Sequence, residues 1–148
     1  MGRKKKVVQA EKAGRKKVSA VENPESFMGK CPVWGFKMHD ASHPRWSIEN
    51  YSFYEAIMNK LISFEGLTWS EIQAASGGRR IGTNHHFEPI EILSKEAQKR
   101  ILELKLDIDE VFSFRLSSTE RLYGIVEDGV FYILWYDPIH EITPVSKK

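Results

Sequence analysis

The spacing of hydrophobic residues changes several times along this chain. Residues 31–40 alternate, with Trp34, Phe36 and Met38 on one side, which predicts a strand with one buried aromatic face. Helical spacing follows, and strand patterns return after Asp107. The predicted helices are residues 51–65, 69–75 and 95–105, and the predicted later strands are residues 110–116, 121–127 and 130–136.

Polar residues mark the starts of the predicted helices. Thr68 and Glu71 have the spacing of a capping box, in which each side chain binds the other residue's main-chain N–H. Ser94 is placed to cap the third helix, and Asn50 or Ser52 to cap the first. The helix boundaries therefore follow from local signals.

The three late strands are predicted to form an antiparallel meander. Asp128-Gly129 is a two-residue hairpin signal, because glycine accepts a positive φ without a Cβ clash. The last strand is apolar on both faces, which indicates a central strand covered on both sides. The glycine-rich segment 77–82 is interpreted as a loop, and residues 87–92 as an extended piece.

These elements indicate an α+β fold with an early β-strand, two to three helices and a C-terminal three-strand antiparallel meander. The chain has 148 residues, of which 41% are hydrophobic, enough for one core. We expect a single domain in residues 29–148, preceded by a flexible tail in residues 1–28.

The charge is concentrated in that tail. Residues 1–20 contain eight Lys or Arg and one Glu, a net charge of +7, so the other 128 residues carry −5 of the total of +2. Such a segment buries too little apolar surface to fold alone, and its charge density favours contact with a polyanion such as RNA. A solubilising tail or a nuclear address is the alternative. The candidate RNA-binding residues are Lys4, Lys5, Lys6, Arg15, Lys16 and Lys17.

Composition limits the other classes. The single cysteine, Cys31, excludes an intramolecular disulfide framework, and no Cys/His spacing resembles a zinc site. No apolar run approaches the roughly 18 residues of a membrane span. We therefore expect a cytoplasmic protein that needs no metal or other cofactor.

Chemically active residue types gather around the meander. The four-residue connection after the first of its strands places Arg115 and Arg121 close together on neighbouring strands. If Glu127 and Val130 flank the hairpin turn, Tyr136 lies opposite Arg121, and the segment through His140 reaches the same end of the sheet.

This order of residues resembles the RelE/ParE superfamily of bacterial toxins. The resemblance rests on "FRL", "ERLYGIVEDGVFYILW" and "YDPIHE", within residues 108–141, and only on element order in residues 33–76. It implies that Arg115 and Arg121 bind phosphate and that His140 is the terminal acid or base. Tyr136 or Tyr123 corresponds to the stacking aromatic residue. The chain differs from the family in its longer N-terminus, its extra segment 77–105 and the absence of a lysine pair.

Metal-free cleavage of RNA explains why such residues would be grouped. A base removes the 2′-OH proton, the oxygen attacks phosphorus, and an acid protonates the leaving 5′-oxygen. Arginine stabilises the charge that builds on the phosphoryl oxygens, and histidine serves as base or acid. The alternatives are a cross-strand ion pair of Arg115 with Glu110, Glu120 or Glu127, and a structural role for His140 in its turn.

Two further groups are candidates for RNA binding. The glycine-rich loop carries Arg79 and Arg80 and is followed by His85 and His86, imidazoles suited to proton transfer or to contacts with bases. Neighbouring histidines on a strand face opposite ways, so at most one joins a site, and an exposed loop is favoured for His86. Arg45 and Trp46 lie in "HPRWS", a composition that suits stacking on an unpaired base. The other tryptophans are expected in the core.

The combined prediction is a toxin-like endoribonuclease that cleaves mRNA without a metal ion at the ribosome and is neutralised by a cognate antitoxin. Two other functions fit the same residues. One is an RNA- or ribosome-binding protein without catalysis. The other is a ParE-like protein that poisons a DNA topoisomerase.

Deletion of residues 1–20 tests the role of the tail. Each phosphate neutralised adds about 0.9 to the slope of log K against log salt for a duplex and about 0.7 for a single strand. The deletion should therefore weaken RNA or ribosome binding and flatten its salt dependence, measured by filter binding between low and high salt. An unchanged slope would reduce the tail to a solubilising segment.

Overall fold

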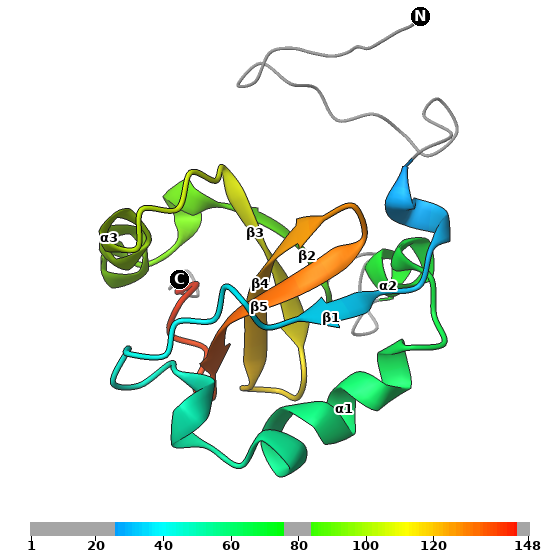
Figure 1. The fold of residues 1–148 in the computed structure, drawn as a ribbon, viewed down its shortest axis with the longest axis horizontal. Coiled ribbons are helices and arrows are strands. Elements are labelled where there is room, and N and C mark those ends of the chain that lie inside the picture. The colour runs from blue at the N-terminus through cyan, green and yellow to red at the C-terminus, as the bar shows by residue number, and fades with distance from the viewer. Residues whose placement is uncertain (1–25, 76–83, 145–148) are drawn as a thin grey trace, which may run out of the picture.

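A five-stranded mixed sheet forms the centre of the protein, in the strand order β1-β5-β4-β3-β2 (Figure 1). The structure is a computed structural model, and it describes residues 26–75 and 84–144. The strands are β1 (Val33–Gly35), β2 (His86–Pro89), β3 (Glu110–Arg115), β4 (Arg121–Glu127) and β5 (Val130–Asp137). The α+β class and the C-terminal antiparallel meander of β3, β4 and β5 are confirmed.

The hairpin between β4 and β5 turns at the two residues that the sequence indicated. Asp128 has φ 53° and Gly129 has φ 85°, the left-handed conformations of a tight hairpin turn. β5 is buried along most of its length and lies between β1 and β4, so the prediction of a doubly covered central strand is confirmed.

The helices begin at the predicted caps. In the first helical segment, residues 53–64, a π turn (Tyr54–Met58) precedes α1 (Asn59–Leu61) and a 3-10 turn (Ile62–Phe64). Ser52 Oγ accepts a hydrogen bond from the N–H of Glu55 at its start. α2 (Trp69–Ala74) has the complete capping box of Thr68 and Glu71, and Ser94 caps α3 (Lys95–Glu103). Shorter 3-10 turns occupy Phe27–Gly29, Ile48–Asn50 and Ile90–Ile92.

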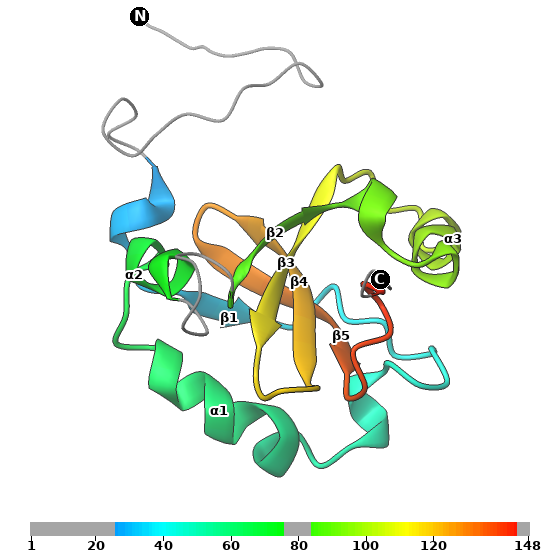
Figure 2. The same ribbon diagram turned by 180° about the vertical axis from the view of Figure 1, so that it is seen from behind.

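Helices cover both faces of the sheet (Figures 1 and 2). α1 and α2 pack on one face, here called the α1 face, against an aromatic cluster that includes Phe112, Phe114 and Phe131. α3 packs on the other face, here called the α3 face, where its residues Ala97 and Ile101 contact a second buried cluster. This cluster includes Trp46, Val111, Tyr123, Leu134, Trp135 and Ile142.

The structure differs from the predicted elements in two respects. β1 has three residues, rather than covering residues 31–40, and it pairs in parallel with β5. The predicted extended piece and third helix between α2 and the meander are present as β2 and α3, but their places in the fold were not predicted: β2 pairs with β3 at one edge, and α3 covers the second face. None of the described helices has the length and apolarity that crossing a membrane requires.

A β-bulge shifts the register of β4 against β5. Tyr123 pairs with Trp135 and Gly124 with Ile133, so Leu134 is the extra residue. A Cβ atom on Gly124 would lie 2.5 Å from both the Phe131 ring and the Tyr132 carbonyl oxygen, which only glycine avoids. The N–H of Asp40 donates to the carbonyl oxygen of Leu134 at 3.1 Å.

The carboxylate of Asp40 connects α3 to the sheet. Its side chain is buried, receives two hydrogen bonds from Arg100 of α3 at 2.6 and 2.7 Å, and receives one from Trp135 Nε1 of β5 at 2.9 Å. Burial opposes ionisation of Asp40, but the hydrogen bonds from Arg100 and Trp135 outweigh it and lower its pKa to about 2.

This ion pair predicts a loss of stability in acid. Because the pKa of folded Asp40 lies below the ordinary value of 3.8, ionised Asp40 stabilises the fold at higher pH, and this contribution disappears as the pH falls from about 4 to 2. Asp40→Asn should lower the free energy of unfolding by about 2 kcal/mol near neutrality and by little at pH 2. Urea titrations across this range measure it, with the exposed Asp107→Asn as the control. An equal loss for Asp40→Asn at both pH values would contradict the role of the charge.

Candidate active site

Polar side chains gather where the α3 face meets one end of the sheet. Arg115 on β3 pairs with Arg121 on β4, and Arg121 pairs with Asp137 on β5. Directly paired residues of antiparallel strands point to the same face. Tyr123, two residues from Arg121, packs in the α3 cluster, so both arginines belong to the α3 face. The predicted pairing of the two arginines is confirmed.

The two guanidinium groups bind main-chain oxygens. Arg115 Nε donates to the carbonyl oxygen of Ser117 at 3.3 Å, and Arg121 Nη1 donates to the carbonyl oxygens of Ser117 and Glu120 at 2.8 and 3.0 Å. Among the described residues neither arginine forms an ion pair with a carboxylate, and Glu120 binds Lys60 instead. Burial, followed by the neighbouring charge of Arg115, lowers the pKa of Arg121. Two such cations side by side are suited to bind an anion.

His140 lies in a turn that Asp137 organises. The carboxylate of Asp137 is fully buried and accepts hydrogen bonds from the N–H groups of Ile139 at 3.3 Å and Ile142 at 2.7 Å. Burial raises the pKa of this carboxyl group. His140 itself has φ 56°, a left-handed conformation that is uncommon for residues other than glycine. The buried carboxylate therefore holds a strained histidine at the end of the sheet.

The electrostatic surroundings of His140 include both arginines. Burial, then the charge of Arg121, lowers the pKa of His140, Glu88 raises it, and Arg115 lowers it further. The turn that holds His140 begins at Asp137, which pairs with Arg121, and it continues to Thr143, which binds Glu88. The two arginines and the start of this turn therefore lie at one end of the sheet.

Glu88 and His86 on β2 complete this group and were not predicted as functional residues. His86 pairs with Ser113, which pairs with Tyr123, so His86 and Glu88 also point to the α3 face. Glu88 is buried, its Oε2 lies 3.0 Å from His86 Nε2, and its Oε1 accepts a hydrogen bond from Thr143. The signal in the sequence is their spacing of two, which puts both on one strand face. We call Arg115, Arg121, His140, His86 and Glu88 the arginine site.

His85, predicted to bind RNA, lies on the opposite face. Its ring is buried against Phe64 and Phe114, at centroid distances of 5.0 and 5.4 Å, and Nδ1 accepts a hydrogen bond from the N–H of Arg115 at 3.0 Å. Burial lowers its pKa to about 4. His85 therefore supports the backbone of Arg115 from inside the protein rather than contacting RNA. His85 and His86 face opposite ways, as expected for neighbouring residues of a strand.

Tyr136 is also outside the arginine site. The bulge at Leu134 moves the register by one residue, so Tyr136 pairs with Leu122 and points to the α1 face. Its hydroxyl donates to Glu120 Oε2 at 2.7 Å, and its ring packs on Tyr51. The predicted contact with Arg121 is wrong, since a shift of one residue reverses the face of a strand side chain.

Trp46 belongs to the core rather than to an exposed stacking surface, and Arg45 is exposed but paired with carboxylates. Trp46 is fully buried, its ring stacks on His43 at 4.0 Å, and its Nε1 donates to Glu141. Arg45 binds the carboxylates of Glu96 and Glu141 at 2.6 and 3.0 Å. Trp34, Trp69 and Trp135 pack against core clusters, as predicted.

The remaining predicted RNA-binding residues lie outside the described residues. They are Lys4, Lys5, Lys6, Arg15, Lys16, Lys17, Arg79 and Arg80.

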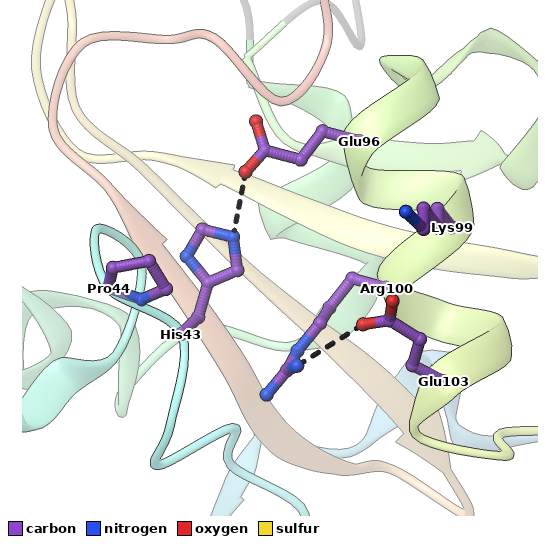
Figure 3. Close-up of a pocket in the computed structure, with 6 residues that line it drawn as sticks. All are labelled: His43, Pro44, Glu96, Lys99, Arg100 and Glu103. Carbon is purple, nitrogen blue, oxygen red and sulfur yellow. Dashed lines mark hydrogen bonds and ion pairs between the residues drawn. The ribbon is translucent and has the colours of Figure 1, made fainter.

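A cavity of about 250 Å³ opens beside α3, and no residue of the arginine site lines it (Figure 3). His43 Nε2 lies 3.1 Å from Glu96, and Arg100 binds both Asp40 and Glu103. The Nδ1 atom of His43 accepts hydrogen bonds from the N–H groups of Arg45 and Trp46. These groups satisfy one another, which indicates a structural network that joins α3 to the loop after β1.

In the described part of the chain, no three His, Cys, Asp or Glu side chains form a group that could hold a metal ion. No protein-family model, curated protein or solved structure matches this chain.

Proposed function

We propose that this protein is a toxin-like endoribonuclease that cleaves mRNA phosphodiester bonds without a metal ion, at the ribosome. The observation that carries the proposal is the pair of half-buried arginines, Arg115 and Arg121, with no carboxylate partner among the described residues. The turn that carries His140 begins at Asp137, the strand partner of Arg121. This arrangement has the charge to hold a phosphodiester and a group that can transfer a proton.

Each side chain has a distinct task in this reaction. The guanidinium groups donate hydrogen bonds to the phosphoryl oxygens and stabilise the charge that grows on them during attack by the 2′-oxygen. The main-chain oxygens of the β3–β4 connection hold these groups, so little ordering is needed when the phosphate arrives. The lowered pKa of His140 makes its protonated form a better proton donor to the leaving 5′-oxygen.

The cellular role extends the resemblance to RelE/ParE toxins. The proposed substrate is mRNA on the ribosome, the basic residues 1–20 contact ribosomal RNA, and an antitoxin protein neutralises the toxin by covering the arginine site. Induction of the chain in a bacterium, followed by mapping of new mRNA 5′ ends against the reading frame, tests this role. Growth arrest without new 5′ ends would favour an RNA- or ribosome-binding protein without catalysis. A purified protein that blocks supercoiling by a topoisomerase would favour the ParE-like alternative.

Arg115→Lys and Arg121→Lys test bidentate phosphate binding. Lysine retains the charge but lacks the planar fork, so cleavage should fall by about tenfold or more in each variant, whereas stability should change by less than about 1 kcal/mol. Single-turnover cleavage and thermal unfolding measure the two effects. Lys60→Arg, which changes the cation in the pair with Glu120, is the control. Parental cleavage rates in both lysine variants would remove the arginines from the site.

His140→Asn tests proton transfer and backbone strain in one variant. Asparagine adopts a left-handed φ more readily than most residues, so the variant should be as stable as the parent or more stable by up to about 1 kcal/mol. Cleavage should fall by about 100-fold to 10,000-fold, because one acid or base is lost. RNA binding should persist. A variant that is both less stable and fully active would assign His140 a structural role only.

A further inference from the structure

The pair formed by His86 and Glu88 has an unused nitrogen. His86 Nε2 faces the Glu88 carboxylate at 3.0 Å, so Nε2 carries the hydrogen and the lone pair is on Nδ1. Nδ1 is shielded from water and has no hydrogen-bond partner among residues 26–75 and 84–144. A buried acceptor without a donor costs about 1–3 kcal/mol. A ligand hydroxyl that donates to Nδ1 would remove this cost.

Glu88 is placed to orient His86 rather than to contact a ligand. Its side chain is 5% exposed, whereas that of His86 is 43% exposed. The second oxygen of Glu88 is occupied by the Thr143 hydroxyl, which also lies 2.7 Å from the Tyr123 hydroxyl. A carboxylate fixed on one side of an imidazole, with the other nitrogen unpaired, is the arrangement of a general base and its orienting group.

His86 also lies within reach of the phosphate-binding arginines. It pairs with Ser113, and Arg115 is two residues further along β3 on the same face. The turn that carries His140 begins at Asp137, which pairs with Arg121, and continues to Thr143, which binds Glu88. In the strand order, β2 and the turn after β5 therefore flank the two strands that carry the arginine pair.

We propose that His86 is the general base of the arginine site, oriented by Glu88, and that His140 is the general acid. This assignment rests on the proposed function. Nδ1 of His86 takes the 2′-OH proton, the 2′-oxygen forms a bond to phosphorus, the bond from phosphorus to the 5′-oxygen breaks, and protonated His140 gives its proton to that oxygen. Glu88 holds the ring of His86 in place, whereas the arginines favour proton loss from His140.

The assignment defines the substrate and the products. The products are a 2′,3′-cyclic phosphate and a free 5′-hydroxyl, with no water consumed, and proton exchange with solvent restores both histidines. The substrate must carry a free 2′-hydroxyl at the scissile position. DNA and 2′-O-methyl RNA therefore bind to the arginine site without being cleaved.

A change of leaving group distinguishes the base from the acid. At the position that the parental protein cleaves, the leaving 5′-oxygen of a synthetic mRNA is replaced by sulfur, which departs without protonation. On the oxygen substrate His86→Gln and His140→Asn should each lose about 100-fold to 10,000-fold in single-turnover rate on ribosomes. On the sulfur substrate His140→Asn should return to within about tenfold of the parent, and His86→Gln should stay low.

Two further variants give the controls. Glu88→Gln keeps the bond to Thr143 but loses the charge, so its rate should fall by about 10-fold to 100-fold on both substrates, as expected for a positioning residue. His39→Gln alters a comparable pair, with His39 Nε2 3.6 Å from Glu49, and should cleave at the parental rate. Circular dichroism confirms that each variant is folded.

The outcomes separate the role of His86 from the function. If the parental protein cleaves and His86→Gln cleaves equally well, the assignment of the base is overturned. The same holds if the sulfur substrate restores the cleavage rate of His86→Gln. In both cases the proposed endoribonuclease activity still stands. A parental protein that cleaves neither substrate on ribosomes overturns the proposed function, and the role of His86 with it.

Discussion

The register between β4 and β5 decides which side chains meet in the arginine site. Leu134 is an extra residue in β5, and it moves Asp137, rather than Tyr136, opposite Arg121. Without this bulge the tyrosine would lie on the α3 face and the aspartate on the α1 face, because strand side chains alternate. Gly124 permits the bulge, and the N–H of Asp40 satisfies the carbonyl group of Leu134. A single inserted residue thus sets the chemistry at the end of the sheet.

The balance of charges at the arginine end of the sheet leaves both guanidinium groups able to bind an anion. Glu88 and Asp137 are both buried on the α3 face, yet each directs its oxygens elsewhere, to His86 and Thr143 or to the main chain of the C-terminal turn. They moderate the repulsion between Arg115 and Arg121 without neutralising either through an ion pair. The site thereby remains attractive to an anion although carboxylates surround it.

Local signals in the sequence predicted the elements well. Thr68 with Glu71 and Ser94 cap the helices as expected, and Asp128-Gly129 closes the hairpin. The pairing of the two arginines was predictable for the same reason, since a short connection joins their strands. What local patterns could not show is non-local: the parallel pairing of β1 with β5, the pairing of β2 with β3, and the bulge. His86 and Glu88 were missed because a spacing of two shows that residues share a face but not what that face contacts.

The order of the strands has a consequence for folding during synthesis. β1 is made first, but its only neighbour in the described sheet is β5, and the pair Val33 and Val130 lie 97 positions apart. Contacts of such long sequence separation form slowly, and this one cannot form until the last strand has left the ribosome. His140 follows that strand. A growing chain therefore exposes the apolar surface that β5 will cover, and it lacks a complete arginine site until translation has passed residue 140.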